Sequence, residues 1–192
     1  MRFNPQTHHR RSVRLPNHDY SSAGAYFVTI CTRNRECLFG SVVNGVMVLN
    51  DAGRTAESYW RETPEHYPDV MADVYVVMPN HVHGILVIKN GVGANNYSPL
   101  RNRPCGTSRT VGAIVRGYKI GVTKWMRENT DMHDVWQRNY YERVIRDEGE
   151  LNRVRQYIAD NPLKWDIDSE NPNNIRDSLL PKLMSGEIRV GA

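Results

Sequence analysis

The chain has 192 residues, with 25 Lys and Arg against 21 Asp and Glu and a formal net charge of +4. This length suits one domain with a hydrophobic core, and 40% hydrophobic with 24% charged residues is globular rather than disordered composition. No apolar run approaches the roughly 20 residues of a membrane-spanning helix, and the three cysteines form no C-x-x-C pair. We therefore expect a cytoplasmic protein without disulfides or a membrane partner, whose positive charge permits a polyanionic one.

Four segments differ in composition. Residues 1–24 are polar and basic and are interpreted as an N-terminal arm. A single domain is expected over 25–165, interrupted at 89–109 by a flexible loop rich in Gly, Asn, Ser and Pro. Residues 166–192 are interpreted as a C-terminal tail.

Apolar runs and helical spacing predict secondary structure in a non-repeating order. The order is strand, strand, helix, hairpin, helix, strand and helix, which is not the alternation of a doubly wound sheet. It predicts an α+β fold in which helices cover one face of an antiparallel sheet. The expected elements are a strand at 25–32, a short strand or a hairpin around Asn44-Gly45 at 37–48, a helix from 51, strands at 73–78 and 81–88, a helix at 111–126, an ambiguous strand and turn at 135–145, and a helix at 147–160.

His81 and His83 stand at the start of an otherwise apolar strand. Because side chains alternate along a strand, both imidazoles point to the same face and could hold one divalent metal ion. A third ligand would come from elsewhere in the fold. The same pattern also occurs on exposed strands and in cores, and spacing alone leaves zinc open, although no cysteine is near in sequence.

Tyr157 and Asn161 are one helical turn apart in the segment RQYIADNP. An amide oxygen is a hard ligand suited to Mg²⁺ or Mn²⁺, so His81, His83 and Asn161 form a candidate metal site. A phenol beside that metal could attack a phosphate and form a phosphotyrosine ester. Tyr157 could instead be a packing residue, as most tyrosines on helices are, and Tyr140 and Tyr141 are rival nucleophiles.

Four segments in order resemble the single-tyrosine HUH transposases of insertion sequences, and most of all the REP-associated tyrosine transposases. The resemblance extends from about residue 11 to residue 165. The segments are YFVTICTRNRECLFG, VMPNHVHGILVI, VWQRNYYERVIRDEGEL and VRQYIADNP.

The resemblance implies a ferredoxin-like core, with His81 and His83 as metal ligands, Asn161 completing the site and Tyr157 as the nucleophile. It implies a metal-dependent enzyme that cleaves and rejoins single-stranded DNA next to imperfect hairpins. The tyrosine would take the 5′ side of the cut and release a 3′-hydroxyl. The cofactor would be Mg²⁺ or Mn²⁺, and the protein a monomer or homodimer.

Basic side chains could neutralise DNA phosphates without reading sequence. The candidate DNA-binding residues are Arg10, Arg11 and Arg14 in the arm, and Arg138, Arg153 and Arg155 in the second half.

Two other functions stay open. One is a hairpin-binding protein without turnover. The other is a metal-dependent hydrolase that activates water with His81, His83 and a carboxylate such as Asp73.

Overall fold

The structure is a computed structural model that describes residues 22–89 and 110–172. Most of the predicted arm, loop and tail, with Arg10, Arg11 and Arg14, therefore lies outside the described residues. Within the two described ranges, no helix has the length and apolar character needed to cross a membrane. The elements are β1 (Gly24–Cys31), η1 (Arg33–Arg35), β2 (Gly40–Val43), β3 (Val46–Leu49), α1 (Asp51–Arg61), α2 (Thr63–His66), β4 (Val70–Val77), β5 (His81–Ile88), α3 (Val111–Asn129), β6 (Tyr141–Ile145), α4 (Glu148–Asp160) and η2 (Pro162–Ile167).

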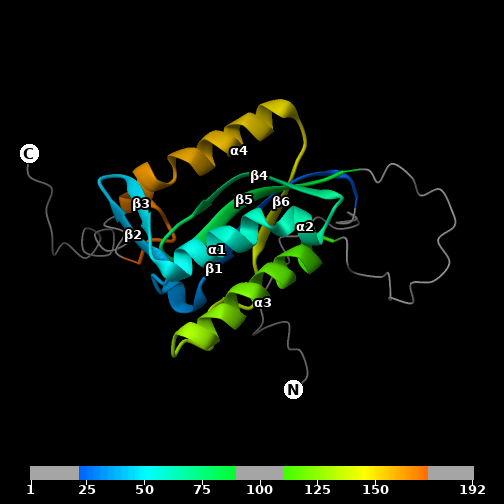
Figure 1. Cartoon of the computed structure of the whole chain (residues 1–192). Coiled ribbons are helices and arrows are strands. Elements are labelled where there is room, and N and C mark those ends of the chain that lie inside the picture. The colour runs from blue at the N-terminus through cyan, green and yellow to red at the C-terminus, as the bar shows by residue number, and fades with distance from the viewer. Residues whose placement is uncertain (1–21, 90–109, 173–192) are drawn as a thin grey trace, which may run out of the picture.

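Four strands form an antiparallel sheet in the order β4-β5-β1-β6 (Figure 1). Strands β2 and β3 form a separate hairpin. Its turn residues Asn44 and Gly45 have φ angles of 51° and 74°, the left-handed conformation that two-residue hairpin turns require. Of the two alternatives predicted here, a short strand or a hairpin, the structure shows the hairpin.

Strand β1 shows how the two faces of the sheet are buried. Tyr26, Val28 and Ile30 are fully buried in one cluster together with side chains of α1 and α3. The intervening Phe27 points to the other face, where it packs in a second cluster with Ile158 of α4. Both faces of the sheet are therefore apolar and covered.

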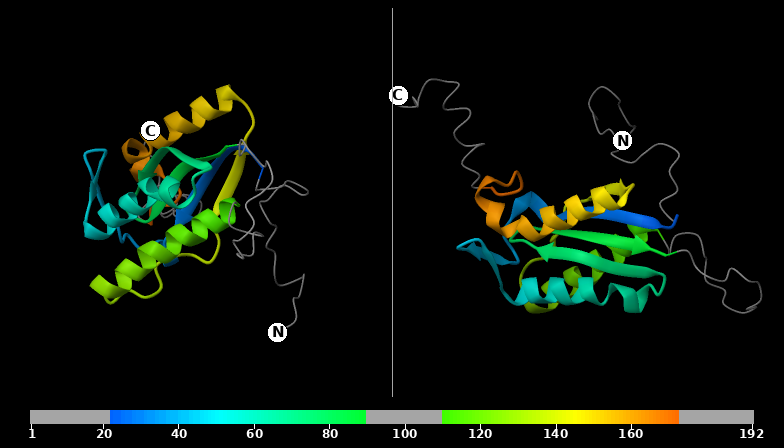
Figure 2. Two further views of the ribbon diagram at one scale, coloured as in Figure 1. Left: turned by 45° about the vertical axis from the view of Figure 1, so that its right-hand side comes forward. Right: turned by 90° about the horizontal axis from the view of Figure 1, so that it is seen from above.

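The α+β class and the antiparallel sheet are confirmed, whereas the helices lie on both faces and not on one as expected. Figure 2 shows the sheet between α4 on one side and α1 and α2 on the other. Helix α4 has an apolar side formed by Leu151, Val154 and Ile158. This apolar side is removed from water by packing against the second face of the sheet.

Helix α3 contains three glycines, and two of them lie where other side chains come close. A Cβ on Gly117 would lie 2.8 Å from the Tyr67 hydroxyl oxygen, and one on Gly121 would lie 2.7 Å from the Tyr59 ring. The glycines therefore allow α1 and the residue after α2 to approach α3 closely. This packing outweighs the poor helix propensity of glycine.

The ambiguous segment 135–145 has the reverse of the expected order. Trp136 makes one isolated bridge to Thr32, and a regular strand begins only at Tyr141. Residues 137–140 are therefore an irregular connection beside the sheet.

Candidate functional site

His81 and His83 occupy the same face of β5, as the alternation predicts. Their exposed fractions are 0% and 3%, and their ring centroids are 4.4 Å apart. Val82 between them belongs to the core cluster on the opposite face. The two imidazoles are therefore buried side by side on the face that α4 covers.

Asn80 fixes the orientation of the His81 ring. Its side-chain nitrogen donates to the backbone oxygens of Arg35, at 3.1 Å, and Glu170, at 2.6 Å. Its amide oxygen therefore faces His81 Nδ1 at 2.9 Å. Since this oxygen can only accept, Nδ1 carries the proton and Nε2 keeps its lone pair in the neutral ring.

His83 is held from both sides. Its Nδ1 is 2.8 Å from the hydroxyl oxygen of Thr29, which stands opposite it in the β1–β5 register. Its Nε2 is 3.3 Å from the hydroxyl oxygen of Tyr157. The structure therefore brings the predicted nucleophile and the predicted histidines together.

Helix α4 positions Tyr157. Asp147 caps the helix by accepting from the backbone nitrogen of Glu150, and Ile158 is fully buried against the sheet. Tyr157 is 44% exposed, and its ring meets the Phe27 ring edge-on at a centroid distance of 6.0 Å. The hydroxyl thus reaches His83 while part of the ring faces solvent.

Asn161 and Asp168 complete the polar cluster. Asn161 is the last residue before η2, which turns the chain back, and its side-chain nitrogen donates to Asp168 Oδ2 at 3.1 Å. Ligand atoms of His81, His83 and Asp168 all lie within 4.8 Å of one another. The sequence interpretation missed Asp168, because it placed residues 166–192 in a tail.

Burial determines the charge state of the histidines. It lowers the pKa of His81, although Asp168, Glu170 and Asn161 act in the opposite direction. Burial and the neighbouring His81 lower the pKa of His83 well below its usual value. Both imidazoles are therefore neutral at pH 7 and have lone pairs to donate.

Tyr157 is in the opposite situation. Burial raises its pKa, the carboxylates of Asp168 and Glu170 raise it further, and the Asn161 side chain acts in the opposite direction. The isolated chain therefore keeps the phenol protonated.

The donor set fits a divalent cation. His81 Nε2 and Asn161 Oδ1 are buried and have no hydrogen-bond partner among the described residues, an arrangement that is costly unless a ligand binds there. Two imidazole nitrogens, one carboxylate and one amide oxygen are ordinary metal donors. His81, His83, Asp168 and Asn161 are the residues that could hold the ion.

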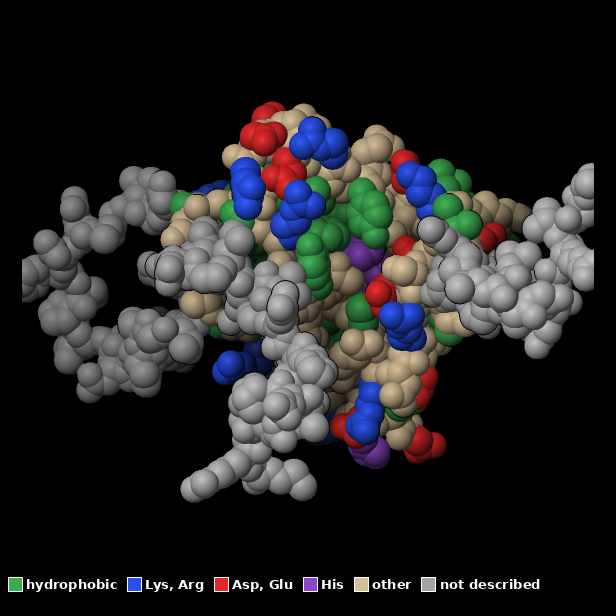
Figure 3. Space-filling model, turned by 180° about the vertical axis from the view of Figure 1, so that it is seen from behind, with side chains coloured by type: hydrophobic (Ala, Val, Ile, Leu, Met, Phe, Trp, Pro, Cys, Tyr) green, Lys and Arg blue, Asp and Glu red, His purple; other side chains and the backbone are tan. Residues whose placement is uncertain are grey.

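A cavity of about 450 Å³ opens in front of His83. Tyr157, Tyr140 and Tyr141 line it together with Phe27. The Tyr140 hydroxyl donates to Glu142 at 2.7 Å, whereas the Tyr157 hydroxyl is directed at His83. Figure 3 views the molecule from behind and shows a histidine side chain next to a group of hydrophobic side chains, with both basic and acidic side chains near them.

Cys31 also lines this cavity. Its thiol lies 3.5 Å from Glu170 Oε2. Burial, with a contribution from the Glu170 carboxylate, raises the pKa of Cys31 to about 12. The thiol is therefore protonated and poorly nucleophilic at neutral pH.

The chain has measurable similarity to known proteins, although no family model matches it. An uncharacterized protein of Haemophilus influenzae is 46% identical over 172 residues, which make up 87% of this chain and 96% of that protein. A second H. influenzae protein, described as a "Putative REP-associated tyrosine transposase", is 26% identical over 148 residues, 76% of this chain and 74% of that protein. The solved structure of a REP-associated tyrosine transposase bound to a REP hairpin has a TM-score of 0.56 at 19% identity, and the match covers 79% of this chain and 74% of that one.

The chain belongs to one family with the uncharacterized H. influenzae protein. It is a distant relative of the REP-associated tyrosine transposases. The resemblance indicated by the motifs is thereby confirmed, and the α+β fold is that of the solved transposase.

In this transposase-like fold, the predicted DNA-binding residues lie in different surroundings. Arg138 lines a groove beside α3, and Arg153 is exposed on α4, one helical turn before Tyr157. Arg155 donates to Asp73 of β4 from Nε at 3.0 Å and Nη2 at 2.7 Å. This ion pair ties α4 to β4.

The same ion pair shows that Asp73 was the wrong carboxylate for the hydrolase alternative. Asp73 is held by Arg155, and the carboxylate that lies with His81 and His83 is Asp168.

Proposed function

We propose that the protein cleaves and rejoins single-stranded DNA next to hairpin-forming repeats through a 5′-phosphotyrosine intermediate. The observation that carries the proposal is the 3.3 Å distance between the Tyr157 hydroxyl oxygen and His83 Nε2. It puts a half-exposed nucleophile at the edge of a buried donor cluster. A phosphate entering the cavity from solvent would meet both.

The reaction is a transesterification at phosphorus. The Tyr157 oxygen forms a bond to the phosphorus, and the bond from phosphorus to the 3′ oxygen of the preceding nucleotide breaks. The phenolic proton passes to water, and the released 3′ oxygen takes a proton from water. The ester keeps the bond energy that a later 3′-hydroxyl needs for rejoining.

The residues around the phenol orient it rather than ionise it. The Phe27 ring and the buried Ile158 fix the position of the tyrosine ring, and His83 fixes the direction of its hydroxyl. Such positioning is a large part of the catalysis expected for phosphoryl transfer.

His81, His83, Asp168 and Asn161 are proposed to hold the cation, as Mg²⁺ or Mn²⁺. A bound divalent cation would favour phenolate and neutralise charge on the phosphoryl oxygens. Asp168 and Glu170 raise the pKa of Tyr157 in the isolated chain, so the proposal makes cleavage strictly dependent on a metal ion.

The DNA substrate is inferred from the relatives. One solved structure that shares this fold is a REP-associated tyrosine transposase bound to a REP hairpin. A similar hairpin with a single-stranded flank is therefore the proposed substrate for this chain.

The test is a denaturing gel with flanked hairpin oligonucleotides labelled at either end. With Mn²⁺, the 3′ label is expected to move with the protein, and the 5′ label is expected in a shorter free strand. Tyr157→Phe is expected to abolish the adduct and retain hairpin binding. Tyr141→Phe is the matched control, because Tyr141 lines the same cavity and is 40% exposed against 44% for Tyr157.

The two other candidate functions predict different results on this gel. Hairpin binding without cleavage would identify a binding protein, and cut strands without a protein adduct would identify a hydrolase. An adduct that survives Tyr157→Phe and disappears with Tyr141→Phe or Tyr140→Phe would show that the substituted tyrosine, and not Tyr157, is the nucleophile.

A further inference from the structure

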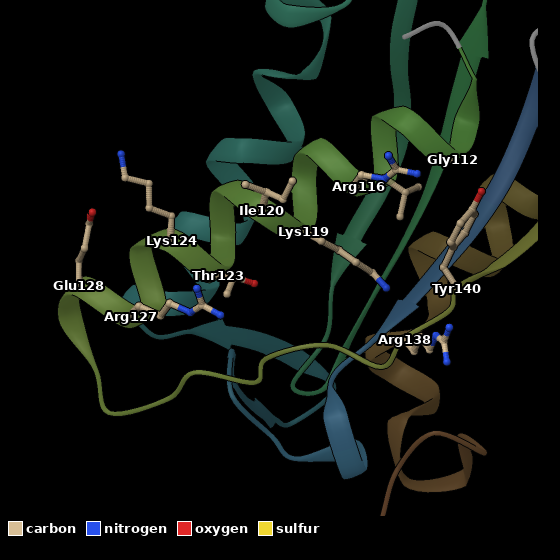
Figure 4. A pocket seen from close by; sticks show the side chains of 11 residues that line it. Gly112, Arg116, Lys119, Ile120, Thr123, Lys124, Arg127, Glu128, Arg138 and Tyr140 are labelled. Atoms are coloured by element: carbon tan, nitrogen blue, oxygen red, sulfur yellow. The ribbon is translucent and has the colours of Figure 1, made fainter. Parts of the chain in front are cut away.

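A basic groove runs along α3 on the side where β6 begins. Its volume is about 710 Å³. Figure 4 shows α3 as one wall and the segment with Arg138 and Tyr140 as the other. The charged residues that line it are Arg116, Lys119, Lys124, Arg127, Glu128 and Arg138.

Three cations of the groove have no carboxylate partner. Among the described residues, the side chains of Arg116, Lys124 and Arg138 have no partner in an ion pair or hydrogen bond. Elsewhere on the surface, by contrast, Arg143 pairs with Glu150 and Lys164 with Asp160. The positive charge of the groove is therefore available to an external anion.

Lys119 makes the second wall of the groove rigid. Its ammonium group donates to the backbone oxygens of Gln137, at 2.8 Å, and Asn139, at 3.0 Å. In return, the indole nitrogen of Trp136 donates to the backbone oxygen of Lys119 at 3.2 Å. Residues 136–139 are thus fastened to α3, and the groove exists before any ligand arrives.

The groove adjoins the cavity of Tyr157. Gln137 and Asn139 line that cavity, Arg138 lines the groove, and Tyr140 lines both. Since successive residues of this segment alternate between the two hollows, a chain-like ligand could pass from one to the other over Tyr140.

We propose that the α3 groove binds the sugar–phosphate backbone of the single-stranded DNA that leaves the Tyr157 cavity. This inference rests on the proposed function. Unpaired cations spaced along a helix suit a row of phosphates, and each phosphate contact releases a counterion. An aromatic ring at the junction suits an unstacked base, which single strands offer and duplex stems do not.

The test measures the salt dependence of DNA binding by fluorescence anisotropy, with EDTA present so that no cleavage occurs. The variant Arg116→Gln/Lys124→Gln removes two exposed cations from the groove. The matched control, Arg54→Gln/Arg61→Gln, removes two exposed cations from α1 that do not line it. The substrate is a hairpin with a single-stranded flank. Each lost phosphate contact lowers the magnitude of the slope of log K against log salt by about 0.7. We therefore expect this magnitude to fall by about 1.4 in the α3 variant and to stay unchanged in the control.

A slope in the α3 variant equal to that of the wild-type protein, or an equal fall in the α1 variant, would overturn the inference. The same hairpin without its flank is expected to show no difference between variants, and an equal fall there would overturn the assignment to a single strand. The adduct gel separates the two proposals. A wild-type adduct without the slope change refutes only the groove, and the slope change without an adduct refutes only the proposed chemistry.

Discussion

The Tyr157 hydroxyl oxygen lies 3.3 Å from His83 Nε2, although 74 residues separate them in sequence. Two local features make this contact. Strand alternation aims His83 at the face that α4 covers, and the buried Ile158 fixes α4 on that face with Tyr157 beside it. The proposed nucleophile and donor cluster therefore meet within one chain.

Asp168 gives the first prediction. Its carboxylate lies with the two histidines, so Asp168→Asn, which removes a negative donor, is expected to weaken Mn²⁺ binding by more than the roughly 10–100-fold typical of outer-shell changes. Isothermal titration calorimetry with the full chain measures this. Asp166→Asn is the matched control, since Asp166 is exposed and outside the cluster. Equal affinities of the two variants would remove Asp168 from the metal site.

Asn80 gives a prediction about a residue that is not a proposed ligand but holds the ring of one, His81. Asn80→Ala removes the acceptor that holds His81 Nδ1, so we expect Mn²⁺ affinity to fall by about 10–100-fold. Asn80→Asp keeps an acceptor oxygen and is expected to retain most of the affinity. Because both variants lose the bonds to Arg35 and Glu170, an equal loss would show that Asn80 acts by holding those segments.

The fold was largely predictable because its signals are local. Alternation in β5 placed His81 and His83 on one face, and the turn at Asn44-Gly45 has its own signature. The sequence interpretation did not expect helices on both faces of the sheet, although the successive apolar residues at 85–88 are typical of a strand buried on both sides. The sequence does not show which helix packs on the second face of the sheet.

The site was predictable only in part. The resemblance to transposases named Tyr157 and Asn161, and helical spacing places them one turn apart. Asp168 has no such signal, because η2 brings it back to the histidines by a turn that leaves no periodic pattern. The contact of Tyr157 with His83 depends on how α4 crosses the sheet, which is a tertiary property.

The buried histidines predict acid sensitivity of the metal-free protein. In the unfolded chain an imidazole takes up a proton near its ordinary pKa of 6.5, whereas burial lowers the pKa of both His81 and His83 in the folded state. Below about pH 6.5 the unfolded state therefore binds more protons. The free energy of unfolding is expected to fall as the pH drops below that value, with no contribution from these groups above it.

Urea unfolding with EDTA at a series of pH values measures this effect. His83→Gln is expected to flatten the fall below pH 6.5. His133→Gln removes an exposed imidazole and is expected to keep the wild-type profile. A profile for His83→Gln that parallels the wild-type one would contradict the assignment.

Gly84 gives a prediction about the strand that carries the histidines. A Cβ at this position would lie 2.2 Å from Cζ2 of the buried Trp60, so Gly84→Ala must displace either α1 or β5. We expect a loss of about 1–3 kcal/mol in the free energy of unfolding, as for other overpacked cores. Trp60→Phe removes the clashing part of the ring, so the double variant is expected to cost less than the sum of the two single variants. Additive losses in urea unfolding would show that Gly84 is needed for a reason other than the indole ring.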